Sequence, residues 1–487
     1  MPFVDEQIKP VELGFEEIAD QLVPANPKIS TDGRAVAFTV TSRSRKGEHT
    51  ERAIWLSRRG EPATRFSGGE SDDREVSFSP DGTTLAFLSN RMDPKMTAIY
   101  LLPLDGGEAQ RLGALEGELS CLTWAPDGKT LAVIRVDHDT DAEKKRKVDK
   151  DDPEVFEEDF KFARLWLVDA GSGTAHCMTW AARNVWDCAW QPDSSGFVYV
   201  STPQNTINSR FTAATLWHVP AKGGLSRRSA EFSTAPESPV VREVDGRPVV
   251  AVIASALQDD PSPSIWTVPL EGDSPVNLLL GHRGAAQSLI PDPRSQSGLI
   301  ARIVEGTHSH LYALSAAEGS LTPMEMPGLA LGGSILDEPS VSSDGEHIAF
   351  AWSGSDCPLE VYVKVPDKDA VPVTSFGKDF DGRLTPGEVV TWKSADGVDI
   401  EGILLYPRDH DAAKQYPLLV QVHGGPSWQW EDRANLSWHN WGQMLTSRGY
   451  AVLLPNPRGS TGYGSDFERL LIDDIGGGES QDLVSGA

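Results

Sequence analysis

The sequence predicts an all-β domain of seven repeated units, a seven-bladed β-propeller, followed by a smaller unit in which strands and helices alternate. Three observations lead to this prediction. A short turn motif recurs along the chain, a second marker recurs in phase with it, and the pattern changes after about residue 373. A unit repeated at one spacing is typical of folds that stack or close copies of one small sheet.

The first marker is an Asp-Gly turn between two strands. FSPDGTTLAFLSN at 78–90 returns as WAPDGKTLAVIRV at 124–136. Asp-Gly suits a tight hairpin because Gly accepts a positive φ without a steric clash. Weaker copies occupy 29–42, 190–202 and 341–353, and two degenerate copies occupy 244–254 and 291–304. The turn aspartates are Asp32, Asp81, Asp127, Asp193, Asp245, Asp292 and Asp344.

The second marker is an aliphatic-aromatic pair in a later strand of each unit. The pairs are Ile54-Trp55, Ile99-Tyr100, Leu165-Trp166, Leu216-Trp217, Ile265-Trp266, Leu311-Tyr312 and Val361-Tyr362. Each unit therefore contains strand, turn, strand, loop, aromatic strand, turn and strand, which describes one propeller blade of about 45–50 residues. An array of β-sandwiches with the same turns is the alternative, and two markers kept in phase favour the propeller.

The composition narrows the range of functions. The chain has 487 residues and a formal net charge of −27, whereas nucleic-acid binding needs a basic face. We expect no membrane association, because an anionic surface would repel the chain and no apolar stretch approaches the roughly 18 residues of a spanning helix. The N-terminal segment lacks the features of a signal peptide. Four cysteines without a CxxC pair predict neither a disulfide framework nor a zinc site, and favour a reducing, cytoplasmic location.

A charged insertion, 137–162, fills the longest gap between the repeats. A solvated loop between two strands explains such a segment. The alternative is that Glu157 and Glu158 lie at a cavity rim, where paired carboxylates would hold the terminal ammonium of a substrate.

The pattern changes after the last repeat. Residues 374–387 are rich in Gly, Asp and Pro and predict a linker. Two strands in 389–407 share an Asp-Gly turn, and a buried strand at 417–422 runs into a glycine loop. The remaining expected elements are a helix over 437–449 that ends at Gly449, a buried strand over 450–454, and a helix over 465–474 with a capping box of Ser465 and Glu468. This alternation predicts a doubly wound α/β sheet.

Two loops after buried strands suggest chemistry. In an α/β-hydrolase fold, a glycine loop such as VHGGP (422–426) supplies a backbone N–H to the oxyanion hole, which stabilises the tetrahedral intermediate by about 3–4 kcal/mol. The second loop, NPRGSTGYG (456–464), also follows a buried strand, so we expect both loops at the same sheet edge. The alternative for each loop is a plain turn that needs glycine.

These motifs and their order resemble the prolyl oligopeptidase family of serine peptidases, in particular its bacterial acylaminoacyl peptidase and dipeptidyl aminopeptidase branch. The matching segments are VQVHGGP, RGYAVLLPNPRGSTGYG and DDIGGGESQDLVSGA. The resemblance implies an all-β seven-bladed β-propeller at 1–373, a linker at 374–387, and the N-terminal part of an α/β-hydrolase domain at 388–487. It implies a serine-type peptidase for short peptides, without cofactor or metal, and leaves a homo-oligomer of the full-length protein open.

The resemblance also assigns roles to residues of the two loops. Gly425 and Gly424 would form the oxyanion hole, His423 would brace the loop, and Arg458 and Tyr463 would shape the wall near the site.

The sequence departs from the family in one respect. The catalytic order in this fold is Ser, Asp, His, with the serine in GxSxG, and no GxSxG occurs in the chain. Ser460, Ser465 and Ser480 lie in PRGSTG, GYGSDF and GGESQD, which do not fit. We therefore expect the triad after Ala487 and no peptidase activity from residues 1–487 alone. The alternative is a non-catalytic propeller that binds peptides or proteins, with a vestigial α/β part.

Overall fold

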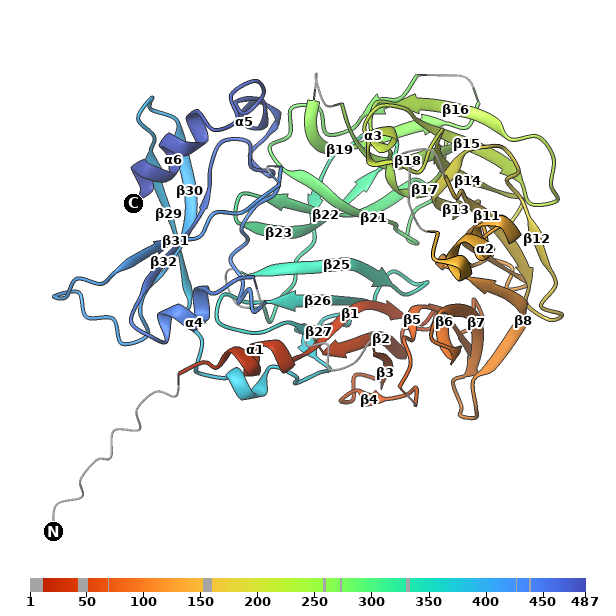
Figure 1. Ribbon diagram of the computed structural model, residues 1–487, viewed down its shortest axis with the longest axis horizontal. Coiled ribbons are helices and arrows are strands. Elements are labelled where there is room, and N and C mark those ends of the chain that lie inside the picture. The colour runs from red at the N-terminus through yellow and green to blue at the C-terminus, as the bar shows by residue number, and fades with distance from the viewer. Residues whose placement is uncertain are drawn as a thin grey trace, which may run out of the picture.

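The computed structural model describes residues 12–42, 51–68, 70–151, 160–256, 260–271, 274–329, 333–425, 427–437 and 439–487. Its larger part is a set of small β-sheets arranged around a centre, and its smaller part is one sheet with short helices (Figure 1). Glu157 and Glu158 lie outside the described residues.

The first 28 strands of the described chain form seven four-stranded units. In each unit the strands follow one another in chain order, and one bridge between β23 and β25 joins the last two units into a single sheet.

Units one to four comprise strands β1 to β16. They contain β1 (Leu22–Ile29), β2 (Ala35–Ser42), β3 (Arg52–Arg58), β4 (Thr64–Arg65); β5 (Arg74–Phe78), β6 (Thr84–Asp93), β7 (Met96–Pro103), β8 (Gln110–Gly117); β9 (Leu119–Trp124), β10 (Thr130–Val136), β11 (Ala163–Asp169), β12 (Ala175–Cys177); and β13 (Asn184–Trp190), β14 (Gly196–Thr202), β15 (Ala214–Pro220), β16 (Arg227–Phe232).

Units five to seven complete the set. They contain β17 (Glu237–Val244), β18 (Arg247–Ala256), β19 (Asp260–Pro269), β20 (Val276–Asn277); β21 (Ala285–Pro291), β22 (Gly298–Glu305), β23 (His308–Ser315), β24 (Thr322–Pro323); and β25 (Ser334–Val341), β26 (Ile348–Ser353), β27 (Glu360–Lys364), β28 (Val371–Pro372). A short helix, α3 (Ile207–Arg210), lies between β14 and β15.

Both sequence markers have one structural position throughout. Each of the seven turn motifs joins the first strand of a unit to the second, and every aliphatic-aromatic pair lies on the third strand. The glycines of the best-preserved turns have positive φ, as their sequence predicts; they are Gly33, Gly82, Gly128 and Gly345 at 72°, 69°, 71° and 74°.

The units close into a ring because each junction buries its own apolar cluster. Six clusters join consecutive units from the first to the seventh. A further cluster joins the seventh unit to the first, with Phe38 of β2 and Val361 of β27 both fully buried. Second strands apolar on both faces fit this arrangement, since each sheet packs between two others.

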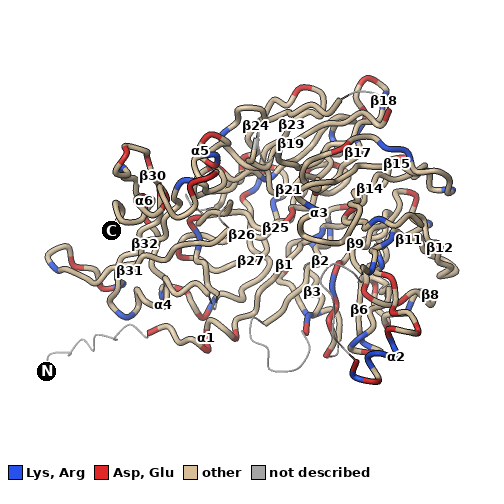
Figure 2. The backbone as a smooth tube through the Cα atoms, turned by 45° about the horizontal axis from the view of Figure 1, so that its top comes forward, with Lys and Arg blue, Asp and Glu red and all other residues tan. Residues whose placement is uncertain are grey.

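The charged insertion differs in part from the prediction of a loop. It contains α2 (Asp141–Asp149), capped by Thr140, whose side chain and that of Glu143 form a capping box. No residue of α2 is buried, and Figure 2 shows charges of both signs along it. The sequence Thr140-x-x-Glu143 carried this signal, and the exposed helix agrees with a solvated segment.

The smaller part of the protein is a four-stranded sheet. It contains β29 (Gly387–Lys393), β30 (Asp399–Leu405), β31 (Leu418–Val420) and β32 (Ala451–Asn456), in the order β29-β30-β32-β31. β31 and β32 are parallel and are connected through α4 (Gly442–Thr446), which is the crossover expected of an α/β sheet. The segment between β28 and β29 includes a short 3-10 helix, Lys378–Phe380.

The predicted helices of this part are shorter than expected. The helix predicted over 437–449 is the single turn of α4, because the side chain of Asn440 accepts a hydrogen bond from the N–H of Gly442 and favours a bend. Gly449 does end this segment, at φ 86°. The predicted capping box at Ser465 is wrong by one position, since Gly464 is the N-cap of α5 (Ser465–Arg469). A last helix, α6, covers Gly478–Gly486.

The first described residues pack against this smaller part. Leu13 and Ile18, the latter in α1 (Phe15–Asp20), form a buried cluster with Phe380, Leu384, Ala434 and Leu436. The chain thus contacts the smaller part both before β1 and after β28. Within the described segments, no helix has the length and apolar character needed to cross a membrane.

Candidate functional site

The two glycine-rich loops meet at one edge of the smaller sheet. They follow β31 and β32, which are parallel neighbours, so both leave the sheet at its carboxyl edge, as the sequence predicts. His423 Nε2 of the first loop lies 3.1 Å from Ser460 Oγ of the second. The N–H of Thr461 donates to the carbonyl of Trp428 at 3.2 Å, which is a second bond between the loops.

His423 lies among aromatic rings at this junction. Its ring centroid is 5.5 Å from that of Trp428 and 6.3 Å from that of Trp430. Burial lowers the pKa of His423, so the imidazole is neutral at pH 7 and donates from one ring nitrogen only. Ser460 is 1% exposed and donates its hydroxyl to the carbonyl of Pro457 at 2.6 Å.

Gly424 and Gly425 present an open stretch of backbone. Gly425 has a φ of 142°, and a Cβ built there would lie 3.0 Å from the N–H nitrogen of Ser427. A Cβ at Gly424 would meet no atom within 4 Å. Both residues are exposed, and among the residues that the structure describes neither N–H donates to a protein acceptor. These two N–H groups can therefore bind an oxygen atom from outside the chain.

Asn456 fixes the outer end of the first loop, a role that no sequence motif indicates. Its side chain is fully buried, accepts from the N–H of Trp430 at 2.7 Å and donates to the carbonyl of Trp430 at 3.0 Å. It also donates to the hydroxyl of Tyr463 at 2.9 Å. A side chain that pairs with both backbone groups of one residue substitutes for a strand neighbour.

Arg458 lies in a buried ionic cluster. It donates to Asp482 through Nε and Nη2, at 3.0 and 2.8 Å, and to Asp396 through both terminal nitrogens, at 2.8 and 2.9 Å. Asp482 is fully buried, in α6, whereas half of the Asp396 side chain is exposed. The hydrogen bonds from Arg458 lower the pKa of Asp396 to about 2. The guanidinium thus connects the β29–β30 turn, the second loop and α6.

Tyr463 faces the ring of sheets. Its hydroxyl donates to Glu401 at 2.8 Å, and its ring lies 5.2 Å from the guanidinium carbon of Arg283, which belongs to the larger part. Burial is the main reason why the pKa of Tyr463 lies well above its usual range. The N–H of Gly306, between β22 and β23, donates to the carbonyl of Gly462 at 2.8 Å. The second loop therefore contacts both parts of the protein.

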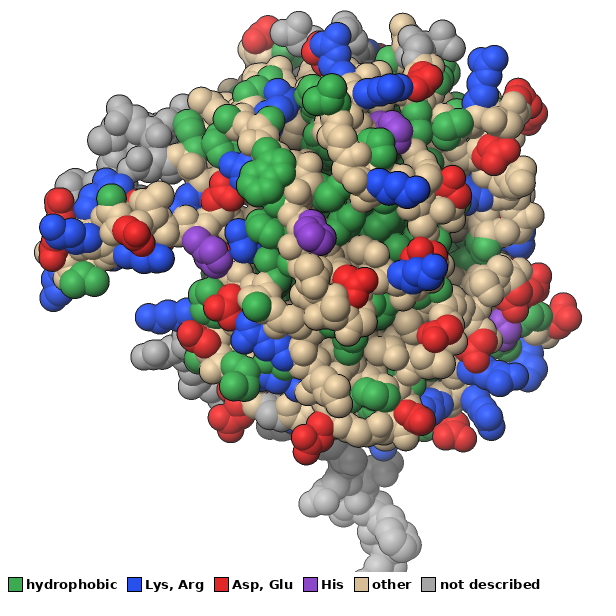
Figure 3. Space-filling model, turned by 90° about the vertical axis from the view of Figure 1, so that its right-hand side faces the viewer, with side chains coloured by type: hydrophobic (Ala, Val, Ile, Leu, Met, Phe, Trp, Pro, Cys, Tyr) green, Lys and Arg blue, Asp and Glu red, His purple; other side chains and the backbone are tan. Residues whose placement is uncertain are grey.

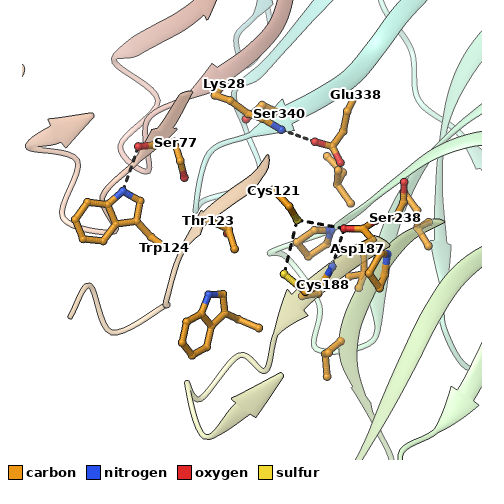
Figure 4. A pocket seen from close by; sticks show the side chains of 18 of the residues that line it. Lys28, Ser77, Cys121, Thr123, Trp124, Asp187, Cys188, Ser238, Glu338 and Ser340 are labelled. Atoms are coloured by element: carbon orange, nitrogen blue, oxygen red, sulfur yellow. Dashed lines mark hydrogen bonds and ion pairs between the residues drawn. The ribbon is translucent and has the colours of Figure 1, made fainter. Parts of the chain in front are cut away.

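A cavity of about 710 Å³ occupies the middle of the ring. Its lining comes from the first strand of all seven units (Figure 4). Lys28 and Glu338 form an ion pair across the junction between the first and seventh units. Every one of these first strands has a register shift, and the φ of Asn26, Glu75, Cys121, Ser238 and Asp337 is positive. The lining strands are thus bulged at the cavity.

A metal site or a basic surface would depend on how the charged and histidine side chains of the described residues are grouped. In the described parts of the chain, no group of three or more His, Cys, Asp or Glu residues is arranged to hold a metal ion. His308 and His310 share a strand face, with ring centroids 6.3 Å apart, and nothing further joins them as a ligand set. On the face shown in Figure 3, positive and negative side chains are mixed.

The comparisons with known proteins agree with this architecture. Residues 436–487 match the model of the prolyl oligopeptidase family. The segment matched contains α4, β32 and the second loop.

Individual relatives extend the likeness along the chain. An uncharacterized peptidase of Bacillus subtilis, YuxL, is 25% identical over 496 residues, which cover 94% of this chain and 73% of the relative. A probable dipeptidyl-peptidase 5 of Aspergillus niger is 25% identical over 60% of this chain and 41% of its own length. The acylaminoacyl peptidase of Pyrococcus horikoshii has the same fold, with a TM-score of 0.73 at 17% identity, over 98% of this chain and 72% of that one.

Proposed function

We propose that residues 1–487 form the propeller and the first part of the catalytic domain of a serine peptidase that hydrolyses short peptides. The observation that carries this proposal is the pair of N–H groups at Gly424 and Gly425, which donate to no acceptor among the described residues and lie at the carboxyl edge of a parallel strand pair. The names of the relatives, which are peptidases, support the class of reaction. An acylaminoacyl or dipeptidyl aminopeptidase activity is the specificity that these names favour.

The proposed domain organisation follows from the packing. We assign the seven four-stranded units to a seven-bladed β-propeller within 1–373, residues 374–387 to a linker, and 388–487 to the N-terminal part of an α/β-hydrolase domain. Seven buried junctions and the order β29-β30-β32-β31 support this division. The helix α1 precedes the proposed propeller in the sequence but packs against the proposed hydrolase part.

In the proposed mechanism, Gly425 and Gly424 stabilise the developing negative charge. Attack on a peptide carbonyl makes a tetrahedral intermediate whose oxygen would accept hydrogen bonds from these N–H groups. A fixed donor of this kind contributes about 3–4 kcal/mol to transition-state stabilisation. His423 holds the loop against Ser460, as its 3.1 Å contact supports.

Arg458 and Tyr463 support the site in different ways. Arg458 holds the second loop in place through Asp482 and Asp396. Tyr463 forms part of the wall between the loop and the ring, through Glu401 and Arg283.

A fluorophosphonate probe tests the proposal, because it labels only an activated serine. No GxSxG occurs in residues 1–487, so we expect neither labelling nor hydrolysis of p-nitrophenyl esters and aminoacyl anilides by this chain. We expect labelling of the longest in-frame product of its gene. Labelling of residues 1–487 would refute the proposed inactivity. Absence of labelling from both proteins would favour the second candidate, a non-catalytic peptide-binding propeller.

Substrate selection by Glu157 and Glu158 stays a prediction, since these residues lie outside the described part of the chain. Their test is the double variant Glu157→Gln/Glu158→Gln in the longest in-frame product. If the carboxylates hold a terminal ammonium, kcat/KM falls by about tenfold or more for free peptides and not for acetylated ones. Equal effects on both substrates would remove the hypothesis. The cytoplasmic location and the oligomeric state also stay predictions.

A further inference from the structure

Two thiols face each other in the wall of the central cavity. Cys121 lies on β9 and Cys188 on β13, which are the first strands of adjacent units and belong to different sheets. Their Sγ atoms are 3.7 Å apart, although the residues are 67 positions apart in the sequence (Figure 4). The sequence, in which the four cysteines are scattered, gave no indication of this contact.

Both thiols face the central cavity, and the contact with Cys188, together with burial, favours the protonated form of Cys121. Both cysteines line the cavity of about 710 Å³, which admits a small solute. The Cys121 thiol donates to Asp187 Oδ1 at 3.4 Å. The contact with Cys188, burial and the charge of Asp187 all raise the pKa of Cys121, so little thiolate is present at neutral pH.

The other two cysteines have different neighbours. Cys177 donates to the carbonyl of Thr179 at 3.4 Å, and Cys357 lies 3.6 Å from the carbonyl oxygen of Pro358. Among the described residues, Cys121–Cys188 is the thiol pair in contact. A thiol that reacts with an oxidant at either position therefore has a partner within reach, whereas Cys177 and Cys357 do not.

We propose that Cys121 and Cys188 are a site of reversible disulfide formation that links the third and fourth units across the cavity wall. A disulfide bond is about 2.05 Å long, so the two sulfurs must approach by about 1.7 Å, which rotation of the side chains and the bulge at Cys121 can supply.

Hydrogen peroxide is the oxidant class that balances the reaction. One thiolate attacks a peroxide oxygen, the O–O bond breaks, and hydroxide leaves and takes a proton to become water. The sulfenic acid that results is attacked by the second thiol, which forms the S–S bond and releases another water molecule. Two thiols and one peroxide thus give one disulfide and two waters, and a dithiol reductant reverses the change.

A bond at this place constrains the ring. It closes a loop of 67 residues between two sheets that are otherwise joined by apolar packing and a few hydrogen bonds. Such a cross-link restricts the unfolded chain, and for a domain of this size we expect a rise of about 5 °C in Tm. The inference does not depend on the proposed peptidase activity.

The test uses the variant Cys177→Ser/Cys357→Ser, which retains only the proposed pair. After treatment of the folded protein with hydrogen peroxide, we expect both remaining thiols to be lost together. Mass spectrometry should show the loss of two hydrogen atoms and one cross-linked peptide containing Cys121 and Cys188, reversed by dithiothreitol. The matched variant Cys121→Ser/Cys188→Ser should give no intramolecular cross-link. Two thiols that remain titratable, separate sulfinic acids, or only intermolecular disulfides would each overturn the proposal.

A second arm examines Asp187. The substitution Asp187→Asn removes the negative charge beside Cys121, so the thiolate fraction rises, and we expect cross-linking at pH 7 to become about threefold faster. The control Asp193→Asn lies in an exposed turn and should leave the rate unchanged. An unchanged rate in Asp187→Asn would show that the geometry around Cys121 differs from that described.

Discussion

The ring and the smaller sheet are held together in contrasting ways. In the ring, seven apolar clusters lie at seven junctions, and the last cluster joins the end of the ring to its beginning. In the smaller part, one compact cluster around Val452 and Leu454 supports the sheet. The outer strand β31 leaves Leu418 and the following Val422 40% and 49% exposed. Apolar burial is therefore distributed in the first part and limited in the second.

Polar side chains compensate for this difference in the smaller part. Arg458, Asp482 and Asn456 are buried there, and each bonds to groups on separate elements. The comparison teaches that a closed repeat can rely on many equivalent contacts, whereas an open sheet depends on a few specific ones. Each of the following predictions tests one side of this contrast.

The largest effect is expected at the junction that closes the ring. Phe38→Ala removes a fully buried ring from the cluster between the first and seventh units and should lower the unfolding free energy by about 4 kcal/mol. Urea unfolding followed by tryptophan fluorescence measures this loss. Phe211→Ala, at a side chain that is 50% exposed, is the control and should change stability little. Equal effects of the two variants would mean that the cluster does not hold the ring closed.

A smaller and more local effect is expected at Arg458. Arg458→Met leaves the fully buried Asp482 without its partner, which should destabilise the smaller part by about 3 kcal/mol. Limited trypsin digestion should then cut after about residue 375 faster than in the unmodified protein and leave the ring intact. Arg34→Met, at an exposed ion pair with Asp32, is the matched control. Simultaneous digestion of both parts would contradict the contrast drawn above.

The hydroxyl of Tyr463 within the smaller part should contribute less again. Tyr463→Phe removes a hydroxyl that accepts from Asn456 and donates to Glu401, with an expected loss of about 1–2 kcal/mol. Differential scanning calorimetry should show a lower Tm for the smaller part alone. Tyr450→Phe, at a side chain that is 39% exposed, should leave the Tm unchanged. A lower Tm for the ring, with no change in the Tm of the smaller part, would contradict this prediction.

Two aspartates should give opposite pH dependences of small size. Burial raises the pKa of Asp187 in the ring to about 6, so the folded state binds the proton more tightly and stability falls as pH rises from about 4 to about 6. The hydrogen bonds from Arg458 lower the pKa of Asp396 to about 2, so its contribution is present above about pH 4 and is lost as pH falls toward 2.

Asn variants separate these two slopes. Asp187→Asn should remove the loss of Tm between pH 4 and 6, and Asp396→Asn should remove part of the loss below pH 4. Thermal unfolding of both variants from pH 2.5 to 8 is the measurement. An unchanged profile in Asp187→Asn would show that this carboxylate is solvated.

Repetition explains why the ring was predictable. The seven turns all lie between first and second strands, and the seven aromatic pairs all lie on third strands. A degenerate copy such as 291–304 can therefore be recognised by comparison with the clearer copies. The glycines at 82 and 128 need positive φ for a reason that is local to the turn. Local signals of this kind can be found without knowledge of the rest of the fold.

The site was only partly predictable because its contacts are not local. The glycine loops after β31 and β32 follow from pattern, but Asn456 pairs with Trp430, 26 positions away, and Arg458 pairs with Asp396, 62 positions away. The helix expected over 437–449 had suitable spacing, yet Asn440 favours a bend within it. The sequence around a single asparagine or arginine does not indicate which distant group its side chain will contact.

The packing of α1 has a consequence for the closure of the ring. The chain enters the ring from α1 and leaves it toward Phe380, and both segments lie in one cluster with Leu436. Both ends of the ring are thus tethered to the same body, and the first and seventh units stay at a high effective concentration, on the order of millimolar, whenever they separate. Separation of these units is then a brief intramolecular event, followed by rapid re-closure. A cut in the chain between residues 374 and 387 would remove one tether and leave closure of the ring to the apolar cluster around Phe38 and Val361.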